Sequence, residues 1–238
     1  MLVQLFIPCF MDQLYPHTAL NTLKVLERAG CTVLYNPAQT CCGQPAFNAG
    51  FIADAKAVCK KFITENIAAD YIVTPSASCC GFVKNNFKTV FEGDIVATDA
   101  SQKLGKKVYE LSYFLIHILK ITHWESSFKG NITYHDSCAA LRECNIKTEP
   151  RLLLNMLQHV TLVEMENTTV CCGFGGSFAV KFADISVAMA EQKVDAALLT
   201  ETEYIVSTDT SCLMHLEGYI IKNNKQIKVL HLADILAS

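Results

Sequence analysis

The sequence contains the same cysteine pattern twice, once in each half of the chain. Cys41-Cys42-Gly43 recurs as Cys171-Cys172-Gly173. A single cysteine precedes the first cysteine of each pair, by 32 positions in the first half and by 33 in the second, and another follows the second cysteine by 37 and 40 positions. The eight cysteines of the pattern, which we call the framed cysteines, are Cys9, Cys41, Cys42, Cys79, Cys138, Cys171, Cys172 and Cys212. The four in each half form one frame. This repeat indicates a gene duplication in which each half carries one set of four thiols.

The residues around the last cysteine of each set repeat as well. The stretch 71–74 reads Tyr-Ile-Val-Thr and leads to Cys79, and 204–207 reads Tyr-Ile-Val-Ser and leads to Cys212. In both copies the tyrosine stands eight positions before the cysteine. We therefore divide the chain into two lobes, residues 1–122 and 123–238, and expect the polar stretch 123–130 to link them.

Short β-prone runs alternate with helical patterns along both lobes. The expected strands are 3–7, 31–35, 71–74, 95–97, 132–135, 160–163, 204–207 and 227–230. The expected helices are 16–29, one that carries the apolar stripe 47–62, 111–121, 149–157 and a long one over 176–200. Such alternation implies right-handed crossovers and mostly parallel sheets. We predict an α/β fold of two duplicated βαβ-type lobes related by a pseudo-twofold axis.

The cysteines all fall at equivalent points of this alternation. Each framed cysteine position comes just after an expected strand and before an expected helix. In a parallel sheet these junctions share the carboxyl edge, where open α/β sheets hold ligands. The four sulfurs of each half should therefore meet at one place. Gly43 and Gly173 would allow the backbone after each cysteine pair to turn sharply with a positive φ.

Composition excludes several classes of function. A net charge of −3 and the lack of a basic run give no indication of a nucleic-acid partner. No apolar run reaches the roughly 18 residues that a membrane span needs, and residues 1–8 read as a first strand rather than a signal peptide. We therefore expect a cytoplasmic protein with no transmembrane segment.

Twelve cysteines in a chain without an export signal indicate metal binding or catalysis rather than structural disulfides. Eight of them belong to the repeated pattern. The other four are expected to be small buried apolar residues: Cys31, Cys59, Cys80 and Cys144.

Three chemistries compete for the framed thiols. A structural zinc site usually takes a pair from a C-x₂₋₄-C turn, which no framed pair provides. A redox-active dithiol would require a strained vicinal disulfide, and no C-x-x-C stands beside a helix. An iron–sulfur cluster has several metal corners, so neighbouring cysteines can bind different irons, and four thiolates are its usual complement. We favour a cluster of the [4Fe-4S] type, with zinc as the lesser alternative and a metal-free structural role also open.

Two histidines and the two glycines complete the candidate cofactor-binding residues. His135 stands three positions before Cys138, and His215 three positions after Cys212. Either imidazole could bind metal or donate a hydrogen bond to sulfur, and either could equally be a packing residue. Gly43 and Gly173 would bring backbone amides close to the sulfurs. No G-x-G-x-x-G follows a strand, and the sequence identifies no catalytic residue.

The two motifs around the cysteine pairs resemble the CCG (cysteine-rich) domain family over essentially the whole chain. The stretches that carry the resemblance are 41–48, 134–138, 171–182 and 212–215. The family includes a subunit of heterodisulfide reductase and iron–sulfur subunits of glycolate- and glycerol-3-phosphate-oxidising enzymes, and the long motifs are similar to its lactate-utilisation branch. The resemblance implies an oxidoreductase subunit that transfers electrons in a complex oxidising L-lactate to pyruvate, with partner subunits that include another iron–sulfur protein.

The chain departs from the heterodisulfide reductase pattern at three positions. That pattern closes each frame with C-x-x-C, whereas Phe82 and His215 stand three residues after the last cysteines here. Family members often have histidine where this chain has Ala139.

Two other functions stay open: a thiol–disulfide redox enzyme of the heterodisulfide reductase type, and a zinc-stabilised assembly protein.

Overall fold

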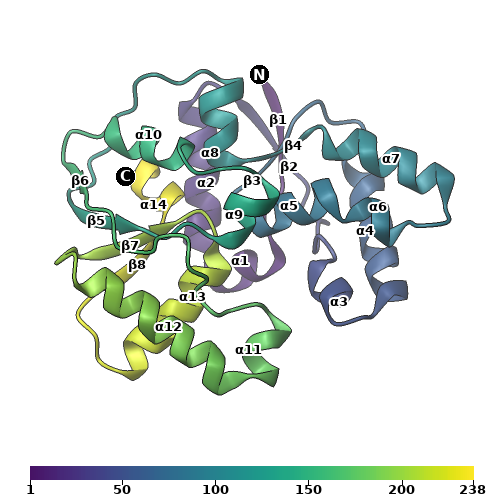
Figure 1. Ribbon diagram of the computed structural model, residues 1–238. Coiled ribbons are helices and arrows are strands. Elements are labelled where there is room, and N and C mark those ends of the chain that lie inside the picture. Colours follow the sequence, from purple (N-terminus) through teal and green to yellow (C-terminus); the bar gives the residue numbers. More distant parts are fainter.

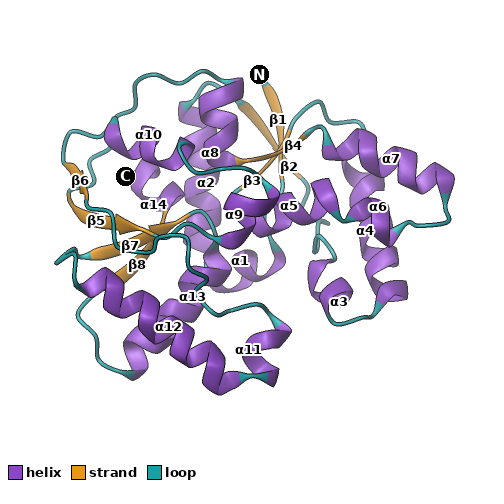
Figure 2. Ribbon diagram, in the orientation of Figure 1, coloured by secondary structure: helices purple, strands orange, loops and turns teal.

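The computed structural model describes residues 1–238 and shows an α/β protein built on two four-stranded sheets (Figures 1 and 2). All strand pairs in both sheets are parallel. The first sheet contains β1 (Leu2–Leu5), β2 (Thr32–Tyr35), β3 (Ile72–Thr74) and β4 (Val108–Glu110). The second contains β5 (Gly130–Tyr134), β6 (Val160–Leu162), β7 (Tyr204–Ser207) and β8 (Lys228–His231). The predicted fold class and the internal repeat are confirmed.

The two sheets have the same strand order. It is β2-β1-β3-β4 in the first lobe and β6-β5-β7-β8 in the second. In both, the first strand of the lobe lies between the second and the third, so the chain first moves to one side and then crosses to the other. This reversal is the topological switch point, and its carboxyl end is the place where open α/β sheets form a crevice for ligands.

Helices connect the strands and cover the sheets. In the first lobe they are α1 (Cys9–Leu14), α2 (Pro16–Arg28), α3 (Gln44–Asn48), α4 (Ile52–Asn66), α5 (Ala77–Asn85), α6 (Phe87–Val90), α7 (Ile95–Gly105), α8 (Leu111–Tyr113) and the π-helical turn η1 (Phe114–Ile118). In the second they are α9 (Cys138–Glu143), α10 (Glu149–Asn155), α11 (Ser177–Lys181), α12 (Ala183–Leu198), α13 (Thr210–Lys222) and α14 (Leu232–Ala237). None of them has both the length and the apolar composition of a membrane-spanning helix.

Three of the expected elements differ from the structure. The strand predicted at 95–97 is wrong: these residues begin α7, because the Asp94 side chain caps the helix by accepting a hydrogen bond from Ala97 N at 3.0 Å. The fourth strand of the lobe is β4 instead. The helix expected over 47–62 is broken after α3, where Gly50 takes φ +87°, and the one expected over 176–200 is broken at Phe182, with φ −130° and ψ 54°.

The two lobes share one hydrophobic core. Its 22 buried residues come from both halves, and they include Val3, Leu26 and Leu115 from the first and Leu154 and Leu236 from the second. A separate core fills the outer part of each lobe. The lobes are joined by helix packing in which α14 lies against α2 and α10 lies against α8; Figure 1 shows the yellow C-terminal helix beside the purple α2. The division at residue 122 stays a prediction, since the core itself crosses it.

Partly buried polar groups also join the lobes. Asp234 at the start of α14 accepts hydrogen bonds from Thr18 Oγ1 and Asn21 Nδ2 of α2, both at 3.0 Å. It also accepts one from His231 N at 3.3 Å, which completes a capping box. Nearer the middle of the molecule, Asp209 Oδ2 accepts a hydrogen bond from Ser78 N at 2.9 Å.

We predict that Asp234→Ala lowers the free energy of unfolding by about 2–3 kcal/mol, because it removes a helix cap and two interlobe hydrogen bonds to a carboxylate. Urea denaturation followed by circular dichroism measures this. Asp99→Ala is the matched control: Asp99 forms an exposed ion pair with Lys103 at 2.7 Å, and its loss should cost about 0.5 kcal/mol or less. Equal losses in the two variants would contradict the prediction.

Candidate metal centre

Both sets of framed cysteines lie at the carboxyl edge of their sheet. The two single cysteines of each set lie in the first turn of a helix. The adjacent pair lies in the loop between a strand and a short helix. In the first lobe, Cys9 opens α1 after β1, Cys41 and Cys42 lie between β2 and α3, and Cys79 lies in α5 after β3. In the second, Cys138 opens α9, Cys171 and Cys172 lie between β6 and α11, and Cys212 lies in α13. The two strands that flank each switch point, β1 and β3 or β5 and β7, therefore supply the single cysteines.

The four thiols of the first lobe interact with one another. Cys42 Sγ donates a hydrogen bond to Cys79 Sγ at 3.3 Å. Hydrogen bonds from the Cys42 and Cys9 thiols lower the pKa of Cys41 to about 3, and Gly43 N also donates to Cys41 Sγ at 3.4 Å. Within the adjacent pair, Cys41 also contacts Cys9 and Cys42 also contacts Cys79, so the four sulfurs form a continuous chain of contacts.

The second lobe repeats this arrangement. Hydrogen bonds from the Cys138 and Cys172 thiols lower the pKa of Cys171 to about 2, and Gly173 N donates to Cys171 Sγ at 3.4 Å. Hydrogen bonds to Cys171 and Cys212, together with burial, raise the pKa of the Cys172 thiol. As in the first lobe, the two cysteines of the pair contact each other, one also contacts the cysteine after the first strand of the lobe, and the other also contacts the cysteine after the third strand.

The backbone after each cysteine pair turns through a glycine. Gly43 has φ +97° and Gly173 has φ +95°, as the sequence predicted. A Cβ at Gly43 would lie 2.7 Å from Cys59 Sγ, and one at Gly173 would lie 2.5 Å from the backbone oxygen of Ser186. Both turns therefore require glycine for two reasons, the left-handed backbone and the close approach of the following helix, α4 or α12.

His135 lies inside the second thiol set. Its side chain is fully buried, and neither ring nitrogen has a hydrogen-bond partner. One ring nitrogen and the sulfurs of Cys172 and Cys212 all lie within 4.8 Å of one another. Burial lowers the pKa of His135 to about 3, so the imidazole is neutral and a lone pair is free to bind a metal. Phe6 stands at the corresponding place in the first lobe, three residues before Cys9.

His215 lies at the outer side of the Gly173 turn. Its Nε2 is 3.1 Å from Ser186 Oγ and 3.2 Å from Ser186 O, and Ser186 Oγ donates to Gly173 O at 2.8 Å. The imidazole thus supports the turn through Ser186. Its role as a metal ligand stays a prediction.

Sequence reasoning missed Lys193. This lysine of α12 is 2% exposed, and its Nζ donates hydrogen bonds to Asn167 O at 2.7 Å and Thr168 O at 3.1 Å, in the loop before Cys171. Burial lowers its pKa to about 8, and the thiols of the second set oppose that shift. The signal was present in the sequence, because Lys193 lies on the same helical stripe as the buried residues Ala190, Val194 and Ala197.

Of the four cysteines outside the pattern, Cys59 contacts the backbone of the first set: its thiol donates a hydrogen bond to Cys42 O at 3.5 Å. Cys31, Cys59 and Cys80 are buried and Cys144 is half-buried. Cys59 packs under the first turn, where burial raises its pKa to about 12. Cys80 of α5 and Cys144, at the end of α9, interact across the lobe interface, and Cys144 Sγ donates to Ala77 O at 3.4 Å. These thiols pack helices against each other.

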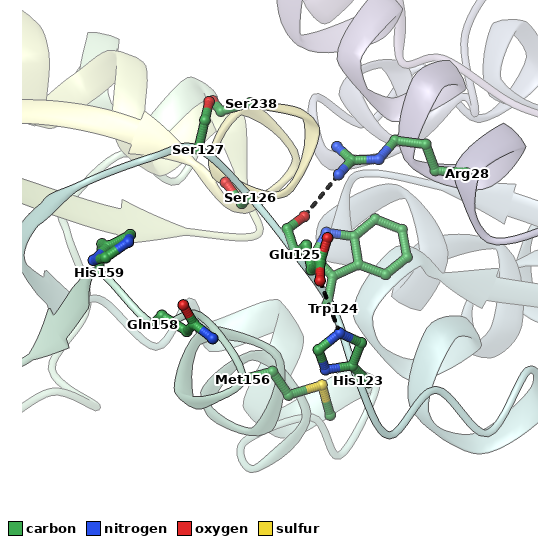
Figure 3. A pocket seen from close by; sticks show the side chains of 10 residues that line it. All are labelled: Arg28, His123, Trp124, Glu125, Ser126, Ser127, Met156, Gln158, His159 and Ser238. Atoms are coloured by element: carbon green, nitrogen blue, oxygen red, sulfur yellow. Dashed lines mark hydrogen bonds and ion pairs between the residues drawn. The ribbon is translucent and has the colours of Figure 1, made fainter.

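A polar pocket of about 460 Å³ lies far from the thiols along the strands. Its lining comes from residues 123–127 and 156–159, which precede β5 and β6, and from Arg28 and Ser238. Figure 3 shows Arg28 reaching across Trp124 toward Glu125. The guanidinium already donates to Glu125 O at 2.7 Å and Leu236 O at 3.0 Å, and no unpartnered buried polar atom lines the pocket. We assign it no ligand.

We predict that Gly173→Ala destabilises the protein more than Gly43→Ala does. Both variants carry the strain of a positive φ, about 1–2 kcal/mol. In Gly173→Ala the new methyl group also meets a backbone oxygen, whereas in Gly43→Ala it meets a thiol that can rotate. Thermal unfolding of both variants measures the difference. Gly218→Ala, where nothing lies within 4 Å in α13, should unfold at or above the wild-type temperature, and an equal fall in all three would contradict the explanation.

Curated relatives match along their whole length. The chain is 39% identical over 236 residues to "Lactate utilization protein A" of Geobacillus thermodenitrificans, which covers 99% of this chain and 98% of that protein. It is 39% identical over 238 residues to the protein of the same name from Bacillus cytotoxicus, covering 100% and 99%. Among solved structures, a hypothetical protein from Helicobacter pylori aligns with a TM-score of 0.58 at 11% identity, over 99% of this chain and 48% of that one, and supports the fold alone.

A family model described as the cysteine-rich domain matches twice, at residues 3–84 and 132–217. Each match contains one complete thiol set and the first three strands of one lobe. The chain belongs to the CCG cysteine-rich domain family.

Proposed function

We propose that this chain is an iron–sulfur electron-transfer subunit of a cytoplasmic system that oxidises lactate to pyruvate. The observation that carries the proposal is the convergence of four thiols at the switch point of each sheet. Lactate utilisation is the function in the name of the full-length relatives. Partner subunits, among them another iron–sulfur protein, would deliver electrons to this chain and take them from it.

The contacts within each thiol set favour a centre with several metal corners. Cys41 contacts Cys9, Cys42 contacts Cys79, and the two sulfurs of the pair contact each other; the second lobe repeats this chain of contacts. A single tetrahedral ion would need all four sulfurs of a set to meet at one point. An iron–sulfur cluster places its irons apart, so adjacent cysteines can bind different corners, and it takes four thiolates. We infer that Cys9, Cys41, Cys42 and Cys79 hold one cluster and Cys138, Cys171, Cys172 and Cys212 the other.

The protein contributes binding, charge and orientation at these sites. The thiols that converge would lose their protons on metal binding, and Cys79 and Cys212 lie in the first turns of α5 and α13, where the helix carries a partial positive charge. Gly43 and Gly173 bring further amides to within 3.4 Å of Cys41 and Cys171. When bound, an iron–sulfur cluster accepts and releases single electrons. At the second site, His135 would act in one of two ways. The bare nitrogen of its neutral ring would bind the metal, or the nitrogen that carries the hydrogen would donate a hydrogen bond to a sulfur.

Protein purified without oxygen should be brown and contain iron and acid-labile sulfide. Cys42→Ser and Cys172→Ser should each lower the iron content by about half, because each removes one ligand from one four-thiolate site. Cys31→Ser, at a buried cysteine outside both sets, should leave the iron content unchanged. Colourless protein with neither iron nor sulfide after anaerobic purification would overturn the cluster assignment.

The tight group of His135, Cys172 and Cys212 favours zinc as a second candidate for the second lobe. Zinc is held by nitrogen and thiolate ligands in tetrahedral sites, and such a site would make the protein a metal-stabilised assembly component. Elemental analysis distinguishes the two: zinc that Cys172→Ser removes, without sulfide, would support this alternative.

His135→Phe tests the histidine separately from the thiols. We expect the fold to be retained, because the variant removes a buried imidazole without partners and copies Phe6 of the first lobe. The iron content or the electron paramagnetic resonance (EPR) spectrum of the second site should change. His123→Gln, at an exposed histidine, is the control and should change neither. An unaltered spectrum and iron content in His135→Phe would show that His135 is a packing residue.

A further inference from the structure

Lys193 is a buried cation without a carboxylate partner. The residue is 2% exposed, and the two hydrogen bonds of its ammonium group go to backbone carbonyls of residues 167 and 168. None of the ion pairs in the structure includes it. An isolated buried charge is costly, and proteins pair such charges or neutralise them. A negatively charged group close to Lys193 would therefore stabilise its charge.

No carboxylate forms an ion pair with Lys193: Glu166, which lines the same small cavity, is exposed to solvent. Asp136 is paired with Arg151, at 2.8 and 2.9 Å. Asp209 accepts hydrogen bonds from Ser78 across the interface and from Ser211, so its carboxylate is already engaged between the two lobes. His135 is neutral. The remaining groups that act on Lys193 are the sulfurs of Cys171, Cys172 and Cys212, which would carry negative charge as thiolates in a metal-bound site.

The first lobe has no such cation. The corresponding wall of its thiol set is aromatic: Phe6 packs on Phe62 with ring centroids 4.7 Å apart, and both are buried. A lysine of α4, Lys61, also donates to a carbonyl of the loop before the cysteine pair, Ala38 O. Its side chain is 41% exposed and is paired with Glu65 at 2.7 Å, so solvent and that carboxylate screen its charge. The two thiol sets therefore share their sulfur geometry and differ in local charge.

We propose that Lys193 is the built-in counter-ion of the second-lobe centre and raises its reduction potential above that of the first-lobe centre. The proposal rests on the iron–sulfur function proposed above. Net charge and solvent exposure around a cluster set its potential, and a nearby positive charge favours the reduced form, which carries one more electron. One electron leaves the first-lobe centre, which is oxidised, and enters the second-lobe centre, which is reduced, with no proton required. Electrons that enter the chain then collect in the second lobe, which becomes the side from which a partner withdraws them.

A redox titration of the anaerobic protein, followed by EPR, tests the proposal. Cys41→Ser/Cys42→Ser leaves only the second site and Cys171→Ser/Cys172→Ser only the first, so their spectra assign the two steps of the wild type. We expect the second site to be reduced at the higher potential. In Lys193→Gln, at a fixed solution potential, the ratio of the reduced to the oxidised form of the second-lobe centre should fall about tenfold. For one electron this corresponds to a potential lower by about 59 mV. The reduction potential of the first-lobe centre should not change.

Two further variants separate charge from structure. Lys193→Arg keeps the positive charge and should restore most of the potential, which a purely structural role in holding the 167–168 loop would not require. Lys61→Gln removes the exposed counterpart and should leave both steps in place.

A second-site potential equal to or below that of the first, or equal shifts in Lys193→Gln and Lys193→Arg, overturns this inference while the clusters themselves stand. Wild-type protein without iron and sulfide overturns the proposed function, and this inference with it.

Discussion

The structure depends on one geometric constraint, that the carboxyl ends of neighbouring parallel strands share an edge. Because β1 and β3 are adjacent, Cys9 and Cys79 lie at the same edge although they are far apart in sequence, and β2 brings in the cysteine pair, which contacts both. Strand order is therefore what assembles the site. The same order in the second sheet assembles the second set, so a duplication of the strand order duplicated the site.

The two halves are coupled more closely than two linked domains would be. One hydrophobic core contains residues of both, and the last helix of the chain packs on the first long helix. The N-termini of α5 and α13 also meet, where Asp209 accepts a hydrogen bond from the backbone of Ser78. Each of these helices carries a framed cysteine, Cys79 or Cys212. The interface thus brings the two candidate centres toward each other, as the proposed electron transfer between them requires.

Duplication has left the sulfurs equivalent and their surroundings unequal. The second set contains His135 and the buried Lys193, whereas Phe6 and Phe62 occupy the corresponding wall of the first. A polar wall with a cation and an aromatic wall stabilise different charge states of the group they enclose. This asymmetry gives the two halves a basis for different roles while the fold and the thiol geometry are preserved.

Much of this architecture could be predicted from the sequence, because it depends on local patterns. The cysteine spacing identified the repeat, strand–helix alternation identified parallel sheets, and Gly43 and Gly173 marked the turns. Local propensity failed where capping overrode it: Ile95 and Val96 favour strands, yet Asp94 begins a helix there. Expected helices were also interrupted at Gly50 and Phe182, since backbone geometry at single residues is not visible in an apolar periodicity.

The sequence by itself determined which sulfurs belong together, because their order along strands and helices leaves one edge where they can meet. Only the tertiary structure decided what surrounds them. Whether a histidine or lysine is buried against sulfur or exposed to solvent depends on the packing of helices distant in sequence, as Lys193 and Lys61 show. Burial sets the energy of a charge, and burial is a property of the folded chain rather than of any segment of it.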